Sequence, residues 1–305
     1  MRILVTDGMD KSAMAALRAN GHEVVEQFYE PAELGTALRD FDCVVIRSAT
    51  KIRKAQLEVA KDSQLKLIIR GGVGVDNIDV ADAEAMGIAV RNTPNASSNA
   101  VAECAIALMF SCARFVSHAG HTMRAGQWEK KGYAKGFELG GKTLGVIGYG
   151  RIGKRIGDIA QGIGMNVLAY QRTYKPEYEC DTMHFASLDE LFAKSDIIAL
   201  STPALGKAII DAESIAKMKD GVVIINTSRG SNIDEAALLE ALNSGKVRAA
   251  GLDVWAEEPT KNVELSTHPA VSALPHVGAS TVEAQKRIGS EIVSIIENFE
   301  FHKYS

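Results

Sequence analysis

Cysteine is scarce in this sequence, and the few cysteines form no recognisable motif. Four occur among 305 residues, at positions 43, 104, 112 and 180. None belongs to a C-x-x-C pair, and none lies in a Cys/His cluster with the spacing of zinc ligands. The pattern therefore favours reduced cytosolic thiols and predicts no metal site.

The sequence also lacks a basic excess and a long apolar run. The 34 Lys and Arg residues against 38 Asp and Glu residues give a formal net charge of -4, which offers no attraction for nucleic acid or an anionic membrane. No run approaches the roughly 20 apolar residues of a transmembrane helix, and the N-terminus soon turns polar, unlike a secretory signal. We expect a cytoplasmic protein with a small-molecule partner, and no nucleic-acid or membrane partner.

Short β-branched runs alternate with longer helical patterns along the whole chain. This alternation predicts parallel βα units, and near-continuous apolar strands suit sheets covered on both faces. In the first part we expect strands at 3–5, 23–26, 43–46, 67–69 and 88–90, and helices at 11–19, 31–38, 54–60 and 80–86. In the second part we expect strands from 144 and at 167–170, 197–200, 222–226, 249–254 and 271–274.

The length predicts two domains, because 305 residues exceed what one hydrophobic core usually supports. We expect two doubly wound α/β domains with a cleft between them. A flavodoxin-like substrate-binding domain would comprise residues 1–96 and 281–305, and a Rossmann nucleotide-binding domain residues 97–280. A closing helix at 282–299 would make the first domain discontinuous. A helix at 100–113, apolar on nearly every face, is expected in a core or at a subunit interface.

A glycine-rich turn, G-Y-G-R-I-G at 148–153, follows the strand that begins at Leu144. Gly148 permits a tight turn, Gly150 lets the backbone approach a pyrophosphate, and Gly153 lets the next helix, 151–162, pack closely. The pattern alone is weak, but its strand and helix context favours a dinucleotide site over a structural turn. Helix-start amides would face the phosphates, so the expected cofactor contacts are Gly148, Gly150, Arg151, Ile152 and Gly153.

The usual marker of NAD, an acidic residue at the end of the second strand, is missing. Gln171 and Arg172 stand there instead. Gln171 does not repel a 2′-phosphate, and Arg172, with Lys175, can pair with one. Solvated loop charges explain the two cations equally well. The cofactor is therefore NAD or NADP, and the sequence leans toward NADP.

Three motifs with polar residues lie at the C-terminal ends of strands of the second series: N-T-S-R-G at 226–230, L-D-V-W-A-E-E-P at 252–259 and L-P-H-V-G-A at 274–279. Open α/β sheets bind ligands at such ends, so the three motifs should face one cleft. Further motifs are R-S-A-T at 47–50, R-G-G-V-G-V-D-N-I-D at 70–79 and N-T-P-N at 92–95. With these motifs in order, the chain resembles the D-isomer-specific 2-hydroxyacid dehydrogenase family, most of all the members that act on D-3-phosphoglycerate.

The resemblance implies hydride transfer between a nicotinamide dinucleotide and a small D-2-hydroxy acid, with three catalytic residues. Arg229 would hold the substrate carboxylate and polarise the carbonyl. His276 would exchange the hydroxyl proton. Glu258, the acid before the proline, would stand beside His276, whereas Glu257 is expected in solvent. Taken singly, each residue also has a structural interpretation: Arg229 as a surface charge, His276 as a turn histidine and Glu258 as a carboxylate at a helix N-terminus.

The resemblance also implies a wider set of ligand contacts. Beyond the glycine turn, the cofactor would meet Gln171, Arg172, Thr202, Thr227, Ser228, Arg229, Asp253, His276, Gly278 and Ala279. The substrate would meet Arg47, Arg70, Gly72, Val73, Gly74, Lys130, Arg229 and His276. Lys130 lies in a segment that resembles the family's dimer-forming region, so a homodimer is expected. Solvated charges remain an equal interpretation of Arg47, Arg70 and Lys130 taken singly.

The identity of the acid rests on these cations. D-3-Phosphoglycerate, oxidised to 3-phosphohydroxypyruvate in serine biosynthesis, carries a distal phosphate that Arg47 and Arg70 suit. A hydroxypyruvate or glyoxylate reductase using NADPH shares the catalytic residues, and Gln171 with Arg172 favours it. A non-catalytic, corepressor-like nucleotide sensor is a third class, although the sequence shows no basic patch or disordered extension. Because the sequence stops at Ser305, we expect no serine feedback through a regulatory domain after this core.

Overall fold

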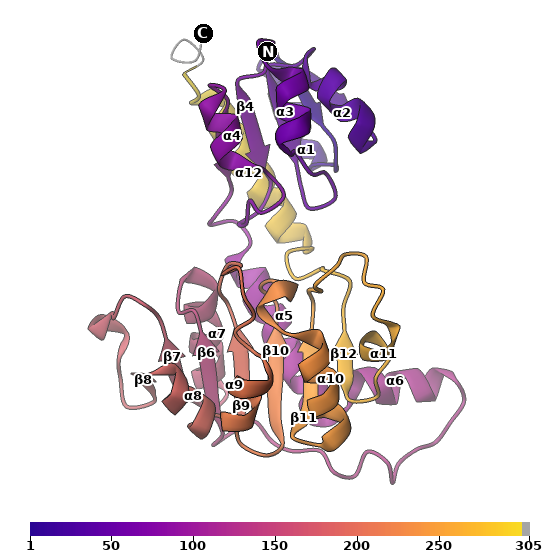
Figure 1. The fold of residues 1–305 in the computed structure, drawn as a ribbon, viewed down its shortest axis with the longest axis vertical. Coiled ribbons are helices and arrows are strands. Elements are labelled where there is room, and N and C mark those ends of the chain that lie inside the picture. Colours follow the sequence, from indigo (N-terminus) through magenta and orange to yellow (C-terminus); the bar gives the residue numbers. More distant parts are fainter. Residues whose placement is uncertain (301–305) are drawn as a thin grey trace. The chain divides into compact units, whose positions relative to one another are not determined.

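Parallel strands build both sheets of the protein, whose computed structural model describes residues 1–300 (Figure 1). The chain divides into two units, one formed by Met1–Ser97 and the chain from Ala279 onward, the other by Ser98–Gly278. Residues 301–305, assigned above to the first domain, lie outside the described part. The predicted fold class, two doubly wound parallel-sheet units, is confirmed.

The first unit has a five-stranded sheet in the order β2-β1-β3-β4-β5. Its strands are β1 (Arg2–Val5), β2 (Glu23–Glu26), β3 (Cys43–Ile46), β4 (Leu67–Arg70) and β5 (Ala89–Asn92). Its helices are α1 (Lys11–Ala19), α2 (Pro31–Leu38), α3 (Lys54–Ala60), α4 (Val80–Ala85) and α12 (Val282–Glu297). Alternate residues of β1 face opposite cores, because Ile3 and Val5 pack with α1 and α12 and Leu4 packs with α2 and α3.

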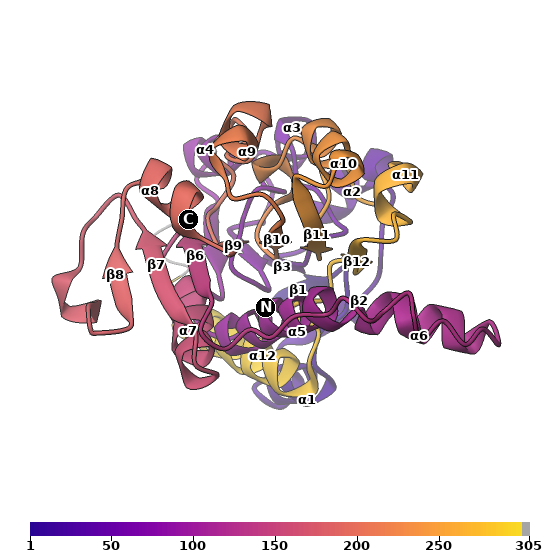
Figure 2. The same cartoon turned by 90° about the horizontal axis from the view of Figure 1, so that it is seen from below.

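The second unit has a seven-stranded sheet in the order β12-β11-β10-β9-β6-β7-β8. Its strands are β6 (Thr143–Ile147), β7 (Asn166–Tyr170), β8 (Met183–Phe185), β9 (Ile197–Leu200), β10 (Val222–Asn226), β11 (Val247–Leu252) and β12 (Val271–Ala273). Its helices are α5 (Ser98–Arg114), α6 (Val116–Arg124), α7 (Arg151–Gly162), α8 (Leu188–Lys194), α9 (Ala212–Lys217), α10 (Glu235–Ser244) and α11 (Val263–Ser266). Figure 2 shows α5 and α7 on one face of this sheet and α8, α9 and α10 on the other.

The strand orders place a topological switch point in each sheet. In the second unit the chain moves outward from β6 to β8 and then returns to the other side of β6 at β9. In the first unit β1 lies between β2 and β3. Connections at such a point diverge to opposite faces and leave room for a ligand at the carboxyl ends of the strands.

Some element boundaries differ from the sequence prediction. β11 ends at Leu252 instead of 254, because both partner strands end opposite Leu252, β10 at Asn226 and β12 at Ala273. β8 and α6 were not predicted: β8 has three residues with polar His184 at its centre, and the polar residues of α6 obscure its period. α5 was predicted to be buried, and half of its length lies in the core.

Over residues 1–300, no single helix is long and apolar enough to cross a membrane. Taken together, α5 and α6 have the length and apolar composition of a membrane span, but the two helices are bent by 67° at the break between them. Most apolar residues of α5 lie in the core against β10 and β11, and Phe110 is exposed. Burial in the second unit therefore accounts for the apolar character of α5.

Candidate active site

The glycine turn after β6 brings the backbone close to the end of β9. Gly148 has φ +93°, and a Cβ there would lie 2.6 Å from the Ser201 carbonyl oxygen and from Thr202 Cγ2. A Cβ on Gly153 would lie 1.9 Å from the Gly148 oxygen. In contrast, a Cβ on Gly150 would meet nothing within 4 Å. The turn is thus closed toward the protein and open at Gly150, where α7 begins with its amides accessible to an anion.

A cavity of about 540 Å³ lies against this turn, inside the second unit. It is lined by the turn itself, residues 170–173, residues 201–203 and part of the segment 205–217. The Gln171 Oε1 atom is buried there and makes no hydrogen bond to any described residue. A buried acceptor without a donor costs free energy, and a ligand hydroxyl would supply that donor. The glycine turn and this acceptor therefore fit the phosphates and a ribose of a dinucleotide.

The charges around the cavity are uneven. Arg172 and Lys207 line it as exposed cations. Both carboxylates of the lining have hydrogen-bond partners. Asp211 accepts the Ser214 amide at 2.8 Å. This hydrogen bond lowers the pKa of Asp211 below its usual range, although burial acts in the opposite direction. Glu213 pairs with Lys217 at 3.1 Å. Arg172 and Lys207 thus add positive charge to the lining, and of its two carboxylates only Glu213 is paired with a cation in the described residues.

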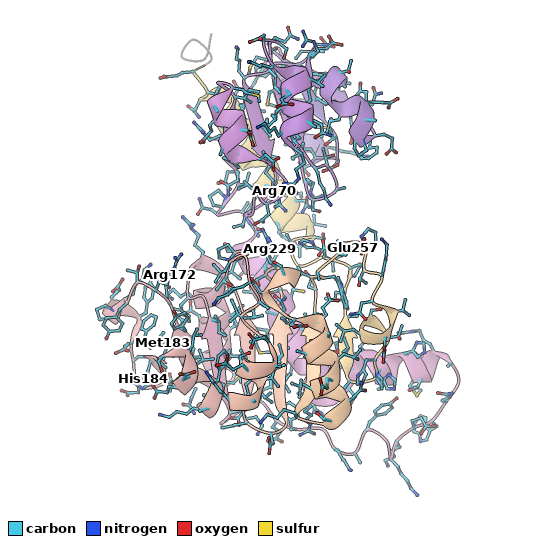
Figure 3. The ribbon with its side chains drawn as sticks, viewed as in Figure 1. Arg70, Arg172, Met183, His184, Arg229 and Glu257 are labelled. Carbon is cyan, nitrogen blue, oxygen red and sulfur yellow. The ribbon has the colours of Figure 1, made fainter. Side chains whose placement is uncertain are left out.

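Three predicted residues of the second unit follow three adjacent strands. Arg229 follows β10, Glu258 lies in the loop after β11, and His276 follows β12. His276 Nδ1 lies 2.7 Å from Glu258 Oε2, and the two side chains are about one third exposed. Figure 3 shows Arg229 and Glu257, the neighbour of Glu258, at the same end of the seven-stranded sheet. Since Glu258 occupies Nδ1, the Nε2 atom of His276 is left for a ligand.

Glu258 is held in its ionised form. Burial alone would raise its pKa, but the hydrogen bond and charge of His276, the Trp255 amide and the charge of Arg229 outweigh burial. The pKa of Glu258 therefore lies below its usual range. The Trp255 amide donates to Glu258 Oε1 at 3.2 Å, so both carboxylate oxygens have partners. A carboxylate fixed in this way orients the imidazole ring.

Asn226 and Trp255 brace these loops, and sequence reasoning missed both roles. Fully buried Asn226 accepts the Ser228 amide at 3.0 Å and donates to the Arg229 carbonyl at 2.8 Å. The Trp255 indole donates to the Leu274 carbonyl at 2.9 Å. A polar residue inside the apolar run of β10 is the signal that marks Asn226. Trp255 carries no such signal, because an indole packs in many cores.

Asp253 holds the turn that carries His276. His276 has φ +57°, a left-handed conformation that is uncommon for a residue with a side chain. Asp253 accepts the Val277 amide at 2.7 Å and the Gly278 amide at 2.8 Å. Burial raises the pKa of Asp253 despite these two hydrogen bonds. Asp253 was predicted as a cofactor contact, and in the structure it is 1% exposed with both oxygens bonded to this turn.

The remaining predicted cofactor residues of the second unit surround the same strand ends. Thr227 and Ser228 are buried after β10, and the Thr202 carbonyl and hydroxyl accept from Asn232 at 3.1 and 3.2 Å. Arg151 and Ile152 form the first turn of α7. Ala279 belongs to the first unit.

The predicted substrate residues of the first unit lie at the carboxyl ends of β3 and β4. Arg47 follows β3 and is partly buried, which lowers the pKa of its guanidinium against the opposing charge of Asp7. Arg70 ends β4, and its guanidinium covers Gly72, where a Cβ would lie 1.4 Å from Nη1. Val73 and Gly74 continue this turn, and Asn92 donates to the Val73 carbonyl at 2.5 Å. Lys130 is exposed in the second unit, between α6 and β6.

Known proteins share both the sequence and the fold. The family model of the D-isomer specific 2-hydroxyacid dehydrogenase NAD binding domain matches residues 106–278. A hydroxypyruvate reductase of Thermotoga maritima is 46% identical over 301 residues, 97% of each chain. A D-3-phosphoglycerate dehydrogenase of Methanocaldococcus jannaschii is 43% identical over 302 residues, which cover 97% of this chain and 57% of that one. The crystal structure of the TT0316 protein of Thermus thermophilus has a TM-score of 0.88 at 32% identity and covers 98% of both chains.

Proposed function

The chain belongs to the D-isomer-specific 2-hydroxyacid dehydrogenase family, and we propose that it interconverts D-3-phosphoglycerate and 3-phosphohydroxypyruvate through Arg229, Glu258 and His276. The observation that carries the assignment of these residues is the 2.7 Å contact between His276 Nδ1 and Glu258 Oε2. Glu258 fixes the ring, so that Nε2 is the atom that exchanges a proton with the substrate oxygen.

Proton transfer and charge stabilisation fall to the protein in this scheme. A bound nicotinamide dinucleotide supplies the hydride for carbon 2 of the acid, or accepts it in the reverse direction. In reduction, protonated His276 gives its Nε2 proton to the carbonyl oxygen, and Glu258 stabilises the charged ring before transfer. Arg229 binds the substrate carboxylate and polarises the carbonyl beside it. In oxidation, His276 removes the hydroxyl proton.

The dinucleotide would bind along the glycine turn, with its pyrophosphate at Gly150 and the α7 amides and a ribose hydroxyl on Gln171 Oε1. The open space at Gly150 and the unpartnered Gln171 oxygen support this arrangement. Thr202, Thr227, Ser228, Gly278 and Ala279 would complete the site, and Asp253 would act by holding the Val277–Gly278 turn. We infer a preference for NADP, because Arg172 and Lys207 line the cavity as exposed cations that pair with no carboxylate of the described residues.

Arg172→Ala should raise the KM for NADPH about tenfold and leave the KM for NADH within twofold. One charge-assisted contact to a phosphate, discounted for exposure, is worth about 1.4 kcal/mol, a tenfold change. Steady-state kinetics with both nucleotides measures the ratio. Lys194→Ala, which removes an exposed cation paired with Glu190 outside the cavity, is the control. An equal change for both nucleotides would refute a 2′-phosphate contact.

The choice of a phosphorylated acid depends on Arg47. Its guanidinium is partly buried and makes no hydrogen bond to another residue in the range 1–300. A desolvated cation of this kind suits a ligand phosphate. Arg70 and the backbone of Gly72, Val73 and Gly74 would complete the anion site in the first unit.

Arg47→Ala should raise the KM for 3-phosphohydroxypyruvate about tenfold, since one charged hydrogen bond at a partly exposed site is lost. The KM for hydroxypyruvate, which has no phosphate, should stay within twofold. Initial rates of nucleotide oxidation with the two acids provide both values. Arg53→Ala, which removes a cation that binds Asp79 on the same unit, serves as the control. Equal losses for the two acids would make hydroxypyruvate the better candidate.

A hydroxypyruvate or glyoxylate reductase is the second candidate function. The Thermotoga maritima relative named hydroxypyruvate reductase aligns over 97% of both chains, whereas this chain spans 57% of the Methanocaldococcus jannaschii dehydrogenase. Such an enzyme would use the same Arg229, Glu258 and His276. The Arg47→Ala comparison separates the two candidates.

We also propose a homodimer formed around α6. Figures 1 and 2 show α6 extending away from the sheet of its own unit. Apolar side chains are exposed on and around it: Phe110 (42%), Val116 (60%), Met123 (53%) and Trp128 (77%). An exposed apolar group of this kind is typical of an interface. Lys130, two residues after Trp128, would then face the neighbouring subunit. Light scattering should give twice the 32.7 kDa mass of one chain.

A further inference from the structure

The loop Arg47–Thr50 lies at the switch point of the five-stranded sheet. It follows β3, and the chain segment that begins at Thr6 follows β1, the strand beside β3. Ser48 and Ala49 at the tip of the loop are exposed, whereas Thr50 is 3% exposed. The loop has no helical or sheet hydrogen bonds of its own at its two ends, so other groups must fix its shape.

Asp7 binds the donors of this loop. Its Oδ2 atom accepts the Arg47 amide at 2.7 Å and the Thr50 amide at 3.0 Å. Its Oδ1 atom accepts the Thr50 hydroxyl at 2.6 Å. The carboxylate therefore makes its hydrogen bonds to the backbone and the hydroxyl of the loop. It interacts with the Arg47 guanidinium through charge alone. Three charge-assisted hydrogen bonds converge on one side chain.

Asn77 binds the acceptors of the same two residues. Its Nδ2 atom donates to the Arg47 carbonyl at 2.6 Å and to the Thr50 carbonyl at 2.7 Å. Asn77 belongs to the segment after β4, on the other side of β3 from Asp7. The amide and carbonyl groups at both ends of the loop are thus all bound, the amides by Asp7 and the carbonyls by Asn77.

We propose that Asp7 and Asn77 are positioning residues that clamp the Arg47–Thr50 loop from both sides and so set the affinity for the anionic acid. The inference rests on the proposed role of Arg47 as a substrate contact. Neither side chain touches the substrate in this scheme. A loop held in one conformation presents the Arg47 cation without an ordering cost on binding, whereas a loosened loop must be ordered by the substrate.

The test replaces Asn77 by Ala in the full chain and measures kinetics with 3-phosphohydroxypyruvate. The KM for this acid should rise about tenfold, while kcat and the KM for the nicotinamide nucleotide stay within twofold. Arg53→Ala is the matched control, because Arg53 donates to the Asp76 carbonyl at 3.0 Å and binds the same segment without touching the loop. The control should leave the KM for the acid unchanged.

Thr50→Val is the second variant, which keeps the side-chain shape and removes the hydroxyl contacts to Asp7 and to Thr6. It should raise the KM for the acid by about threefold, and it carries the test if Asn77→Ala does not fold. An unchanged KM in a folded variant, or equal changes in KM for acid and nucleotide, would overturn the clamp. Arg47→Ala, measured beside them, separates the two ideas: an effect there without one at Asn77 removes only the clamp, and no effect there removes the substrate site itself.

Discussion

Replacing His276 by Ala should lower kcat by about two to four orders of magnitude, the usual worth of a general acid-base group. The variant lacks the proton donor for the carbonyl oxygen, so hydride arrival leaves an unprotonated alkoxide. The glycine turn and Gln171 are untouched, and the Kd of NADH and NADPH should stay within about threefold of wild type. Absorbance at 340 nm gives kcat, and nucleotide fluorescence gives Kd.

His184→Ala is the matched control, because His184 is an exposed histidine on β8 in the same unit (Figure 3). It should keep wild-type kcat and Kd. A His276→Ala variant with near wild-type kcat would remove His276 from the mechanism. A variant that loses kcat and nucleotide binding together would indicate a collapsed turn, and Asp253, which holds that turn, would then be the residue to examine.

Replacing Glu258 by Gln should lower kcat for reduction about a hundredfold and change the pH profile of kcat. The amide still reaches His276 Nδ1, but it no longer stabilises the charged ring that donates the proton. The variant should also lack the acid limb of kcat that protonation of Glu258 causes in the wild type. In the wild type, Glu258 stays ionised across neutral pH because its pKa lies below the usual range.

The lowered pKa of Glu258 also makes the free energy of unfolding depend on pH. A carboxylate with a lowered folded pKa stabilises the protein above its unfolded pKa, roughly 4.3, and this contribution disappears as the pH falls through the folded pKa. Glu257→Gln is the control, since Glu257 pairs with Lys261 at 2.6 Å on the surface. It should leave the pH profile of kcat in place. A Glu258→Gln profile that superimposes on wild type would contradict the pairing with His276 during turnover.

Hydrophobic period and turn residues were enough to predict the fold class. The apolar runs at 197–200 and 222–226 coincide with β9 and β10, because buried parallel strands leave little room for polar residues. The glycine turn was equally legible, since the close contacts at Gly148 and Gly153 tolerate no side chain. The three proposed catalytic residues were predicted from motifs of the family, and the contact of Glu258 with His276 follows from the neighbouring positions of β11 and β12.

Residues that act through another residue were not predicted. Asn226, Asp7 and Asn77 use side chains to bind backbone groups of other loops, and no local pattern tells which loop a side chain will reach. Asp253 shows the same limit, because its place in a motif suggested a ligand contact while its oxygens bind two amides. Such pairings depend on strand order, which brings together residues far apart in sequence.

We propose that the protein is a dehydrogenase that works through His276 and Glu258. The most direct test of this proposal is the oxidation of NADH and NADPH by the purified protein with 3-phosphohydroxypyruvate, hydroxypyruvate, glyoxylate and pyruvate, with chiral analysis of the product. We expect turnover that yields the D-isomer, the highest kcat/KM with 3-phosphohydroxypyruvate, and near loss of turnover in His276→Ala. A wild-type protein that binds the nucleotide and reduces none of these acids would contradict the account.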